Sequence, residues 1–279
     1  MLATRYFKIW IGGLILLVLL IGGLAAPLLA PYDPQEQRLE DRLKPPSWNG
    51  QGSGGYLLGT DNLGRDILSR IIYGSRISLL VGATTVILAG FMGCFLGAIA
   101  GYFGKVADEF INKITEIFLA FPFLLLAIAL MAFLGQGLVN VIIALMLTRW
   151  VQYCRVVRGE VLSLKERDFV LAARALGGRD FYILLRHVVP NTLASVTVIA
   201  TFAMAIVIIA EASLSFLGLG VPASIPTWGS MLAEGRSYMY RAPWLTIFPG
   251  MAIFITVFGI NLLGDGLRDI LDPKLRGQR

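Results

Sequence analysis

Residues that could carry chemistry are few in this sequence, and their spacing excludes the common catalytic and metal sites. The single histidine, His187, has no second histidine or cysteine nearby, so neither an H-E-x-x-H zinc site nor a cluster of imidazole ligands can form. The stretch 101–106 (GYFGKV) lacks the spacing and the hydroxyl of a G-x-x-x-x-G-K-[ST] phosphate loop, and no G-x-S-x-G elbow occurs. We therefore expect a chain that is not an enzyme, does not hydrolyse ATP itself and holds no cofactor or metal.

A second group of polar residues lies within or close to long apolar stretches. Its members are Gln136, Asn140, Arg149, Glu211 and Asn261. Any of them could line a substrate pathway, but such residues equally form hydrogen bonds between helices or extend a charge to the membrane surface. We take Gln136, Asn140, Glu211 and Asn261 as the candidates for pathway lining. Glu116, Glu211 and Asp265 fall near the ends of apolar runs, which disfavours intramembrane proteolysis and proton relay.

The elements that must position these residues are membrane spans. Hydrophobic residues make up 56% of the 279 residues and charged residues 15%, whereas a soluble domain carries about a quarter charged residues. Runs of ~20 uncharged residues cross a bilayer as helices, and Gly135-Gln136-Gly137 provides a turn within the longest run. The sequence predicts six spans, near 9–30, 77–104, 115–134, 138–155, 193–211 and 245–264, with Arg149 towards the end of the fourth.

The first run has an alternative interpretation as a cleaved secretory signal, because Arg5 and Lys8 precede it and 24–26 (LAA) follow it. Its uncharged stretch is longer than the apolar core of a signal, about 7 to 15 residues, which favours a span.

Cys94 and Cys154 fall in or at the inner end of predicted spans, so we expect two inert buried thiols rather than a disulfide.

The distribution of charge predicts the orientation. Lys and Arg of short loops are retained in the cytoplasm, and placing both termini there puts the whole excess of +6 on the cytoplasmic side. The opposite orientation would leave the basic segment 149–186 outside. The charge therefore needs no nucleic acid as a partner, and we expect a multi-pass protein of the bacterial cell (inner) membrane with both termini cytoplasmic.

The longest predicted inner connection, 156–190, contains the pattern of a short helix. Asp168 can cap its start, and Gly177 and Gly178 can end it. One apolar stripe is predicted in between, made of Phe169, Ala172, Ala173 and Leu176. Asp180 can start a second short helix, and Pro190 marks the turn into the fifth span. A short helix with an apolar stripe fits a groove on a partner, although it could also lie on anionic lipid.

This loop resembles the E-A-A-x3-G-x9-I-x-L-P loop of bacterial ABC importer permeases. The matching positions are Ala172, Ala173, Gly177 and Pro190, whereas Leu171 stands in place of the usual Glu and His187 in place of the usual Ile. In that family the loop is a coupling helix seated in a groove of the ATPase subunit. The resemblance thus implies an ATPase-coupling role for Asp168, Leu171, Ala172, Ala173, Arg174, Leu176, Gly177, Gly178 and Pro190.

Further motifs along nearly the whole chain are similar to the C-type permease subunit of dipeptide, oligopeptide and nickel importers. They are 42–47 (RLKPPS), 58–66 (LGTDNLGRD), 72–79 (IYGSRISL), 212–220 (ASLSFLGLG), 227–229 (TWG), 261–269 (NLLGDGLRD) and 271–273 (LDP). The resemblance implies an all-α polytopic membrane protein of the type I ABC importer permease fold, with six transmembrane helices and a cytosolic coupling helix. It also implies two regions, an N-terminal span and outer segment over 1–76 and the importer transmembrane domain over 77–279.

The same resemblance implies a permease that translocates dipeptides or short peptides delivered by an extracytoplasmic substrate-binding protein. The other implied partners are a homologous second permease, membrane lipid and two ABC ATPase subunits that carry ATP and Mg. Uptake of nickel chelates, opines or glutathione by the same architecture remains open. An ion-coupled secondary transporter is a further alternative, but it requires ionisable groups near mid-bilayer.

The outer segments are predicted to be short helices and turns over the membrane surface, forming a docking face for the binding protein and the second permease. They are 31–76, rich in Pro, Gly and charge, and 213–241. Asp61 and Asp66 around Gly64 provide too few oxygens for a calcium site. We expect them to form Asx-turns and to pair with Arg65 instead.

Overall fold

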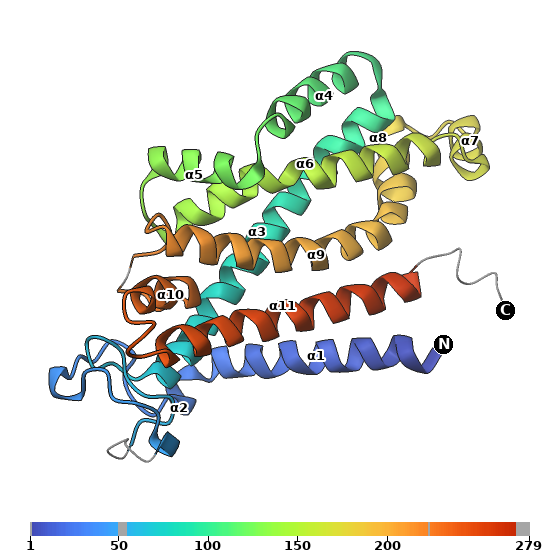
Figure 1. The fold of residues 1–279 in the computed structure, drawn as a ribbon. Coiled ribbons are helices and arrows are strands. Elements are labelled where there is room, and N and C mark those ends of the chain that lie inside the picture. The colour runs from blue at the N-terminus through green and yellow to red at the C-terminus, as the bar shows by residue number, and fades with distance from the viewer. Residues whose placement is uncertain (1, 50–54, 223, 272–279) are drawn as a thin grey trace.

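The computed structural model describes residues 2–49, 55–222 and 224–271, and this part of the chain is helical without a β-strand. Long helices run side by side, and α3 crosses them obliquely (Figure 1). The long helices are α1 (Leu2–Leu24), α3 (Ile67–Phe103), α4 (Lys105–Leu119), α5 (Phe123–Leu134), α6 (Leu138–Leu164), α9 (Val189–Phe216) and α11 (Trp244–Leu271). The short helices are α2 (Ala26–Leu29), α7 (Asp168–Ala175), α8 (Asp180–Ile183) and α10 (Trp228–Arg236), with 3-10 turns at Leu39–Asp41 and Ser47–Asn49.

Four helices of the described chain are long and apolar enough to cross a membrane, and a bent pair, α4 with α5, raises the number to five. The predicted fourth span lies in α6, which is long enough to cross but carries Arg149, Gln152 and Arg155 along its course. The all-helical membrane architecture is confirmed, and the number of six spans stays a prediction.

Two predicted spans are interrupted. The span predicted near 115–134 is wrong as one straight helix, because α4 and α5 meet at 89°. Pro122 lies at the break as the N-cap of α5; it cannot donate a backbone hydrogen bond, and it disfavours helical geometry at Phe121. The run 9–30 likewise divides at Ala25 into α1 and α2, with a proline in the first turn of α2. The turn predicted at Gly135-Gln136-Gly137 is confirmed.

A row of glycines brings α3 and α6 into close contact. A Cβ atom built on Gly93 would lie 2.3 Å from the Trp150 carbonyl oxygen, and one on Gly97 would lie 2.4 Å from the Cys154 carbonyl oxygen. Gly101 continues the row, since its Cβ would lie 2.9 Å from the Arg158 carbonyl oxygen. The repeated small residues therefore serve close helix contact within this chain. Cys154 is buried at this seam and Cys94 is half-buried, and neither forms a disulfide.

The first helix, α1, packs along α11. A Cβ on Gly12 would lie 2.6 Å from the Gly259 carbonyl oxygen, and a Cβ on Gly259 would lie 2.7 Å from Ile15. The Lys8 ammonium lies 3.2 Å from the Asp269 carboxylate at the other end of this contact. The first predicted span is therefore an integral layer of the helical bundle.

Polar residues join the two outer segments at one end of the bundle. Arg65 and Arg70 both contact the carboxylates of Asp61 and Glu234, with 2.6 Å between Arg65 Nη2 and Glu234 Oε2. The Asp61 Oδ1 atom also accepts hydrogen bonds from the backbone N–H groups of Leu63 and Arg65, which confirms the predicted Asx-turn and Arg65 pairing.

Asp66 has a separate role as the N-cap of α3. Its Oδ2 accepts hydrogen bonds from the Ser69 backbone N–H at 2.8 Å and from the Ser69 hydroxyl at 2.7 Å. Burial raises the pKa of this carboxyl above its usual range, and these two hydrogen bonds oppose the shift. The predicted character of segment 31–76, short helices and turns, is confirmed, although α3 begins within it at Ile67.

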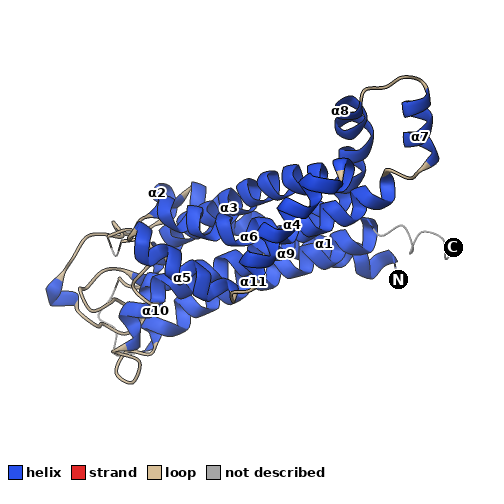
Figure 2. Cartoon of the chain, turned by 90° about the horizontal axis from the view of Figure 1, so that it is seen from above, coloured by secondary structure: helices blue, strands red, loops and turns tan. Residues whose placement is uncertain are grey.

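The two ends of the bundle differ in composition and in the parts of the chain they hold. The N-terminal end of α1, the C-terminal end of α11 and the short helices α7 and α8 lie at one end, and α2, α10 and the outer segments lie at the other (Figures 1 and 2). This grouping is the one that the charge distribution predicts. Lys274, Arg276 and Arg279, which contribute to that prediction, lie outside the described residues, as do Asp272 and Pro273 of the last motif.

Candidate functional site

The first candidate site is α7, which projects beyond the long helices at the end of the molecule shared by the two terminal helices (Figure 2). One side chain anchors it: Val170 is fully buried in a cluster with Tyr102 of α3 and Val157 and Val161 of α6. Ala173 packs against the same cluster. Through this cluster α7 rests directly on α3 and α6, the two helices that the glycine seam holds together.

Hydrogen bonds tie the segment after α7 to α3. The Tyr102 hydroxyl donates to Asp180 Oδ1 at 2.9 Å and accepts from Arg174 Nη2 at 3.2 Å. Arg174 and Asp180 themselves lie 3.6 Å apart, and the hydrogen bond to Tyr102 raises the pKa of Arg174. The guanidinium therefore remains charged, and α7 and α8 share one polar anchor on the last turn of α3.

The ends of α7 agree with the sequence in part. The prediction that Asp168 caps the helix is wrong: Arg167 is the N-cap, and Asp168 is the first helical residue, where its charge still suits the helix dipole. The predicted termination is confirmed, because Gly177 has a φ of +84° and Gly178 donates its N–H to the Ala173 carbonyl at 3.0 Å.

The apolar stripe predicted for α7 divides between two faces. Ala173 turns toward the bundle, whereas Phe169 is 43% exposed and Leu176 is 89% exposed, and Ala172 is exposed beside them. Leu171, at the position where a Glu is usual, is also exposed, at 45%. The outward face of α7 is thus apolar and is not covered by any part of the chain that the structure describes.

The entry into α9 differs from the prediction. Pro190 marks no turn, because α8, a π-helical turn at Leu184–Val188 and α9 follow one another without a break. Pro190 occupies the first turn of α9, where a missing N–H is tolerated. The Asn191 side chain donates to the His187 carbonyl at 2.6 Å within the same turn. Asp180 begins α8, as predicted.

The pathway role of Gln136, Asn140, Glu211 and Asn261 stays a prediction, and the structure gives their contacts within the chain. Asn140 Nδ2 donates to the Leu134 carbonyl at 2.7 Å within the turn between α5 and α6, and Gln136 Nε2 joins this turn to the segment after α9 through the Gly218 carbonyl at 2.6 Å. Glu211 is fully buried rather than reached by water, and it accepts from the hydroxyls of Ser215 and Ser78 at 2.8 and 3.3 Å. Asn261 is half-buried on α11. None of the four lines the cavity described next.

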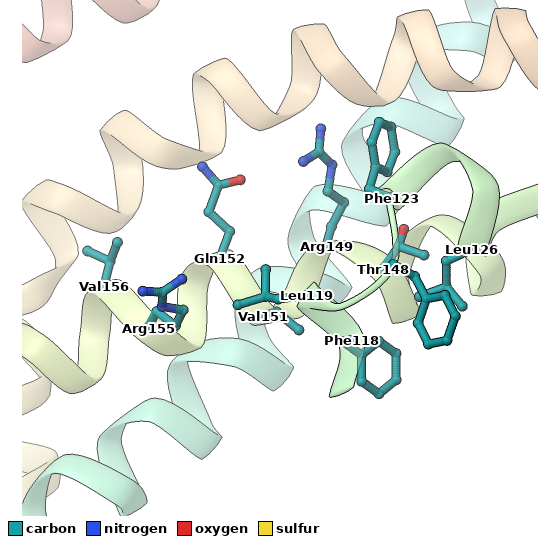
Figure 3. A pocket seen from close by; sticks show the side chains of 11 residues that line it. Phe118, Leu119, Phe123, Leu126, Thr148, Arg149, Val151, Gln152, Arg155 and Val156 are labelled. Carbon is teal, nitrogen blue, oxygen red and sulfur yellow. The ribbon is translucent and has the colours of Figure 1, made fainter. Parts of the chain in front are cut away.

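A cavity of about 530 Å³ lies where the break between α4 and α5 faces α6 (Figure 3). Its apolar walls include Phe118, Phe121 and Phe123. Its polar lining comes from α6, as Thr148, Arg149, Gln152 and Arg155. The Arg149 guanidinium carbon lies 4.3 Å from the centre of the Phe123 ring. The position of Arg149 towards the end of a span is therefore corrected: α6 continues to Leu164, so Arg149 lies near the middle of the helix.

These features define a class of protein: a multi-pass membrane component with a projecting short helix at the end where its termini lie and a polar cavity among its spans. Residues 93–277 match the model of the binding-protein-dependent transport system inner membrane component. Residues 9–46 match that of the N-terminal transmembrane domain of oligopeptide transport permease C. The chain belongs to the binding-protein-dependent transport system inner membrane component family, the permease components of ABC importers, in which the ATPase is a separate subunit.

Curated relatives match nearly the whole chain. It is 45% identical to the Di/tripeptide transport system permease protein DppC of Pseudomonas aeruginosa, over 95% of this chain and 88% of that protein. It is also 45% identical to the Glutathione transport system permease protein GsiD of Pectobacterium atrosepticum, over 95% and 86% of the two chains. For the Oligopeptide transport system permease protein OppC of Bacillus subtilis the identity is 42%, over 99% and 89%.

A solved structure has the same fold. A chain of the MetNI methionine ABC transporter in an inward-facing conformation superposes with a TM-score of 0.61 at 18% identity, over 74% of this chain and 98% of that chain. The predicted type I importer permease fold is thereby confirmed.

Proposed function

We propose that this chain is the C-type permease subunit of an ATP-driven importer of dipeptides or short peptides. The observation that carries the proposal is the 45% identity, over 95% of the chain, with a relative named as a di/tripeptide permease. A substrate-binding protein delivers the cargo at the end that holds α2 and α10, and a homologous second permease completes the path. Two separate ATPase subunits bind ATP and Mg. Both termini are cytoplasmic in this proposal, because the excess of basic residues lies at their end of the bundle.

The coupling role belongs to α7 in this proposal, with Asp168, Leu171, Ala172, Ala173, Arg174, Leu176, Gly177 and Gly178 in or beside it and Pro190 at the start of α9. The support is its geometry: an apolar outward face at the cytoplasmic end, and an anchor on the buried side through Val170. A short helix seated in a groove transmits a rigid-body motion. Residues 1–76 form an added N-terminal region on a transmembrane domain of residues 77–279.

Glutathione is the second candidate cargo, because a relative named as a glutathione permease is as similar to this chain as the peptide permease is. The test is uptake by proteoliposomes that contain the complete importer and its binding protein. We expect ATP-dependent uptake of a labelled dipeptide, with an excess of unlabelled dipeptide competing more strongly than the same excess of glutathione. Transport by this chain in sealed vesicles without any ATPase would contradict the proposal and favour a secondary transporter.

Leu176→Asp is expected to weaken binding of the ATPase subunits. The side chain is 89% exposed, so the change leaves the fold intact while it places a charge in a desolvated contact. We expect co-purification of the ATPase with the permease to fall roughly tenfold or more, which corresponds to the cost of burying an unpaired charge or polar group. Leu39→Asp, on a residue that is 68% exposed at the opposite end, is the matched control. If the two variants recover equal amounts of the ATPase, α7 does not contribute to the contact with it.

Gly177→Val is expected to uncouple ATP hydrolysis from transport. The backbone at Gly177 has a φ of +84° and open space around it, so a side chain causes conformational strain and no clash. A β-branched residue in this region costs about 1 to 3 kcal/mol, which frays the end of α7. The measurement is cargo transported per ATP hydrolysed. Gly177→Asn should retain most of the coupling, because Asn tolerates positive φ, and equal losses from both variants would contradict the strain argument.

A further inference from the structure

Arg149 is a cation in the interior of α6. It lies eleven residues from the start of α6 at Leu138, which places it about 16 Å along the helix at 1.5 Å per residue. The apolar run at the start of α6 ends at Thr148, so the guanidinium directly follows the part of the helix that is suited to hydrocarbon. A charge on a helix of a membrane bundle is costly in lipid, and it faces a protein interior or a water-filled cavity instead.

The described residues supply no anion for this charge. Nε and Nη2 of Arg149 are both buried and have no hydrogen-bond partner, and none of the ion pairs among the described residues includes Arg149. The guanidinium lies over the face of the Phe123 ring, which carries a partial negative charge. Elsewhere the buried guanidinium groups contact carboxylates, as at Arg65 and Arg70, although Nε of Arg70 is also without a partner. An unpaired fork of donors is therefore a specific feature of this cavity.

The surroundings of Arg149 fit a small ligand with an apolar body and one anionic group. The Arg149 and Gln152 side chains extend from α6 on one side, with the Phe123 ring beside the guanidinium (Figure 3). The volume of about 530 Å³ lies within the range of small-molecule sites. A second cavity of about 340 Å³ shares Val156 with the first and reaches Ser195 and Arg268 toward the cytoplasmic end. Cations thus line both cavities, Arg149 and Arg155 the first and Arg268 the second.

We propose that Arg149 binds the C-terminal carboxylate of a peptide cargo as it passes through the membrane. This inference rests on the proposed function and assigns a subsite to it. A guanidinium matches a carboxylate with two parallel hydrogen bonds, and Gln152 and Arg155 supply further donors on the same helix. The phenylalanine walls receive the apolar part of the cargo. The cargo can leave Arg149 because Arg155 and then Arg268 offer its carboxylate further cations toward the cytoplasmic end.

The experiment measures uptake of two labelled dipeptides that differ only at the C-terminus, one a free acid and the other an amide. The complete importer is reconstituted in proteoliposomes, and each ligand is presented on binding protein of measured occupancy. We expect Arg149→Gln to lower uptake of the free acid roughly 10- to 100-fold, the range for loss of a charge-assisted hydrogen bond. Uptake of the amide should fall less than about twofold, since it lacks the charge that Arg149 recognises.

Two variants serve as controls in the same assay. Arg149→Lys keeps the charge without the bidentate geometry and should give an intermediate loss for the acid. Lys113→Gln removes a cation of α4 that is 67% exposed and outside the cavity, and the ratio of acid to amide uptake should not change.

A second measurement keeps Arg149 and therefore applies even if Arg149→Gln fails to assemble. Gln152→Cys is made in a Cys94→Ala, Cys154→Ala background, and its modification by an anionic and a cationic thiosulfonate reagent is compared in the complete importer. We expect the anionic reagent to react at least about threefold faster, and the free dipeptide to slow the reaction more than its amide does.

The outcomes separate this inference from the proposed function. Absence of peptide uptake by the unaltered importer contradicts the proposed function itself. Peptide uptake with equal losses of acid and amide in Arg149→Gln overturns the inference and assigns the arginine to a carboxylate of the partner permease. Equal rates for the two thiol reagents, or equal protection by acid and amide, also overturn it.

Discussion

Gly93→Ala is expected to separate α3 from α6 and to destabilise the whole bundle. The added Cβ would lie 2.3 Å from the Trp150 carbonyl oxygen and 2.6 Å from the Tyr153 Cβ. Both neighbours belong to the facing helix and cannot rotate away as the tip of a long side chain could. Overpacking of this kind costs typically 1 to 3 kcal/mol, and we expect the upper part of that range because the obstacle is backbone. The measurement is the thermal unfolding temperature of the purified importer in nanodiscs.

Gly159→Ala is the matched control, because Gly159 lies on α6 and a Cβ there would meet nothing within 4 Å. It should leave stability unchanged or raise it by about 0.5 to 1 kcal/mol through the better helix propensity of alanine. Gly97→Ala should behave like Gly93→Ala, since its Cβ would lie 2.4 Å from a carbonyl oxygen of the same helix. Similar unfolding temperatures for all three variants would show that the seam tolerates expansion.

The glycine row also shows how far the sequence determines a membrane fold. Small residues four apart predict close helix contact. They do not identify the partner helix, because the atoms that the glycines contact are backbone carbonyls, which every residue has. The structure supplies the partner, α6, and places the seam between the two helices that anchor α7.

The predicted span boundaries failed where helices extend beyond the bilayer. Uncharged runs mark the part of a helix in contact with hydrocarbon, and α3, with 37 residues, and α6, with 27, both continue past it. For that reason Arg149 was predicted near the end of a span, although it lies near the middle of α6. Composition also does not reveal a bend, and only Pro122 signals the 89° break that opens the cavity around Arg149.

The helix in the loop 156–190 was predictable, but its orientation was not. The spacing of Phe169, Ala172 and Leu176 correctly places three residues on one exposed side. Val170 was missed because a single buried residue has no periodicity, and its partners Tyr102 and Val157 come from distant helices. A lone β-branched residue on the polar side of a short helix is the one signal that could have identified it.

Asp61→Ala is expected to detach the outer segment from the bundle. Asp61 is 3% exposed and contacts two buried guanidinium groups, those of Arg65 and Arg70, which then share only Glu234. Removal of one partner from a buried ion pair typically costs about 3 to 5 kcal/mol, because a charge stays buried without compensation. The measurement is again thermal unfolding in nanodiscs, with limited proteolysis between α2 and α3 as a local readout.

Two further variants separate the contribution of charge from that of the turn. Asp61→Asn keeps an oxygen that can accept from the N–H groups of Leu63 and Arg65 and loses only the charge. Most of the destabilisation should therefore persist in Asp61→Asn if the buried arginines cause it. Glu36→Ala removes an exposed carboxylate paired with Arg38 and should cost no more than about 1 kcal/mol. If Asp61→Asn unfolds at the temperature of the unaltered protein, the turn and not the charge cluster joins the outer segment to α10, and the four-residue network is only a consequence of that contact.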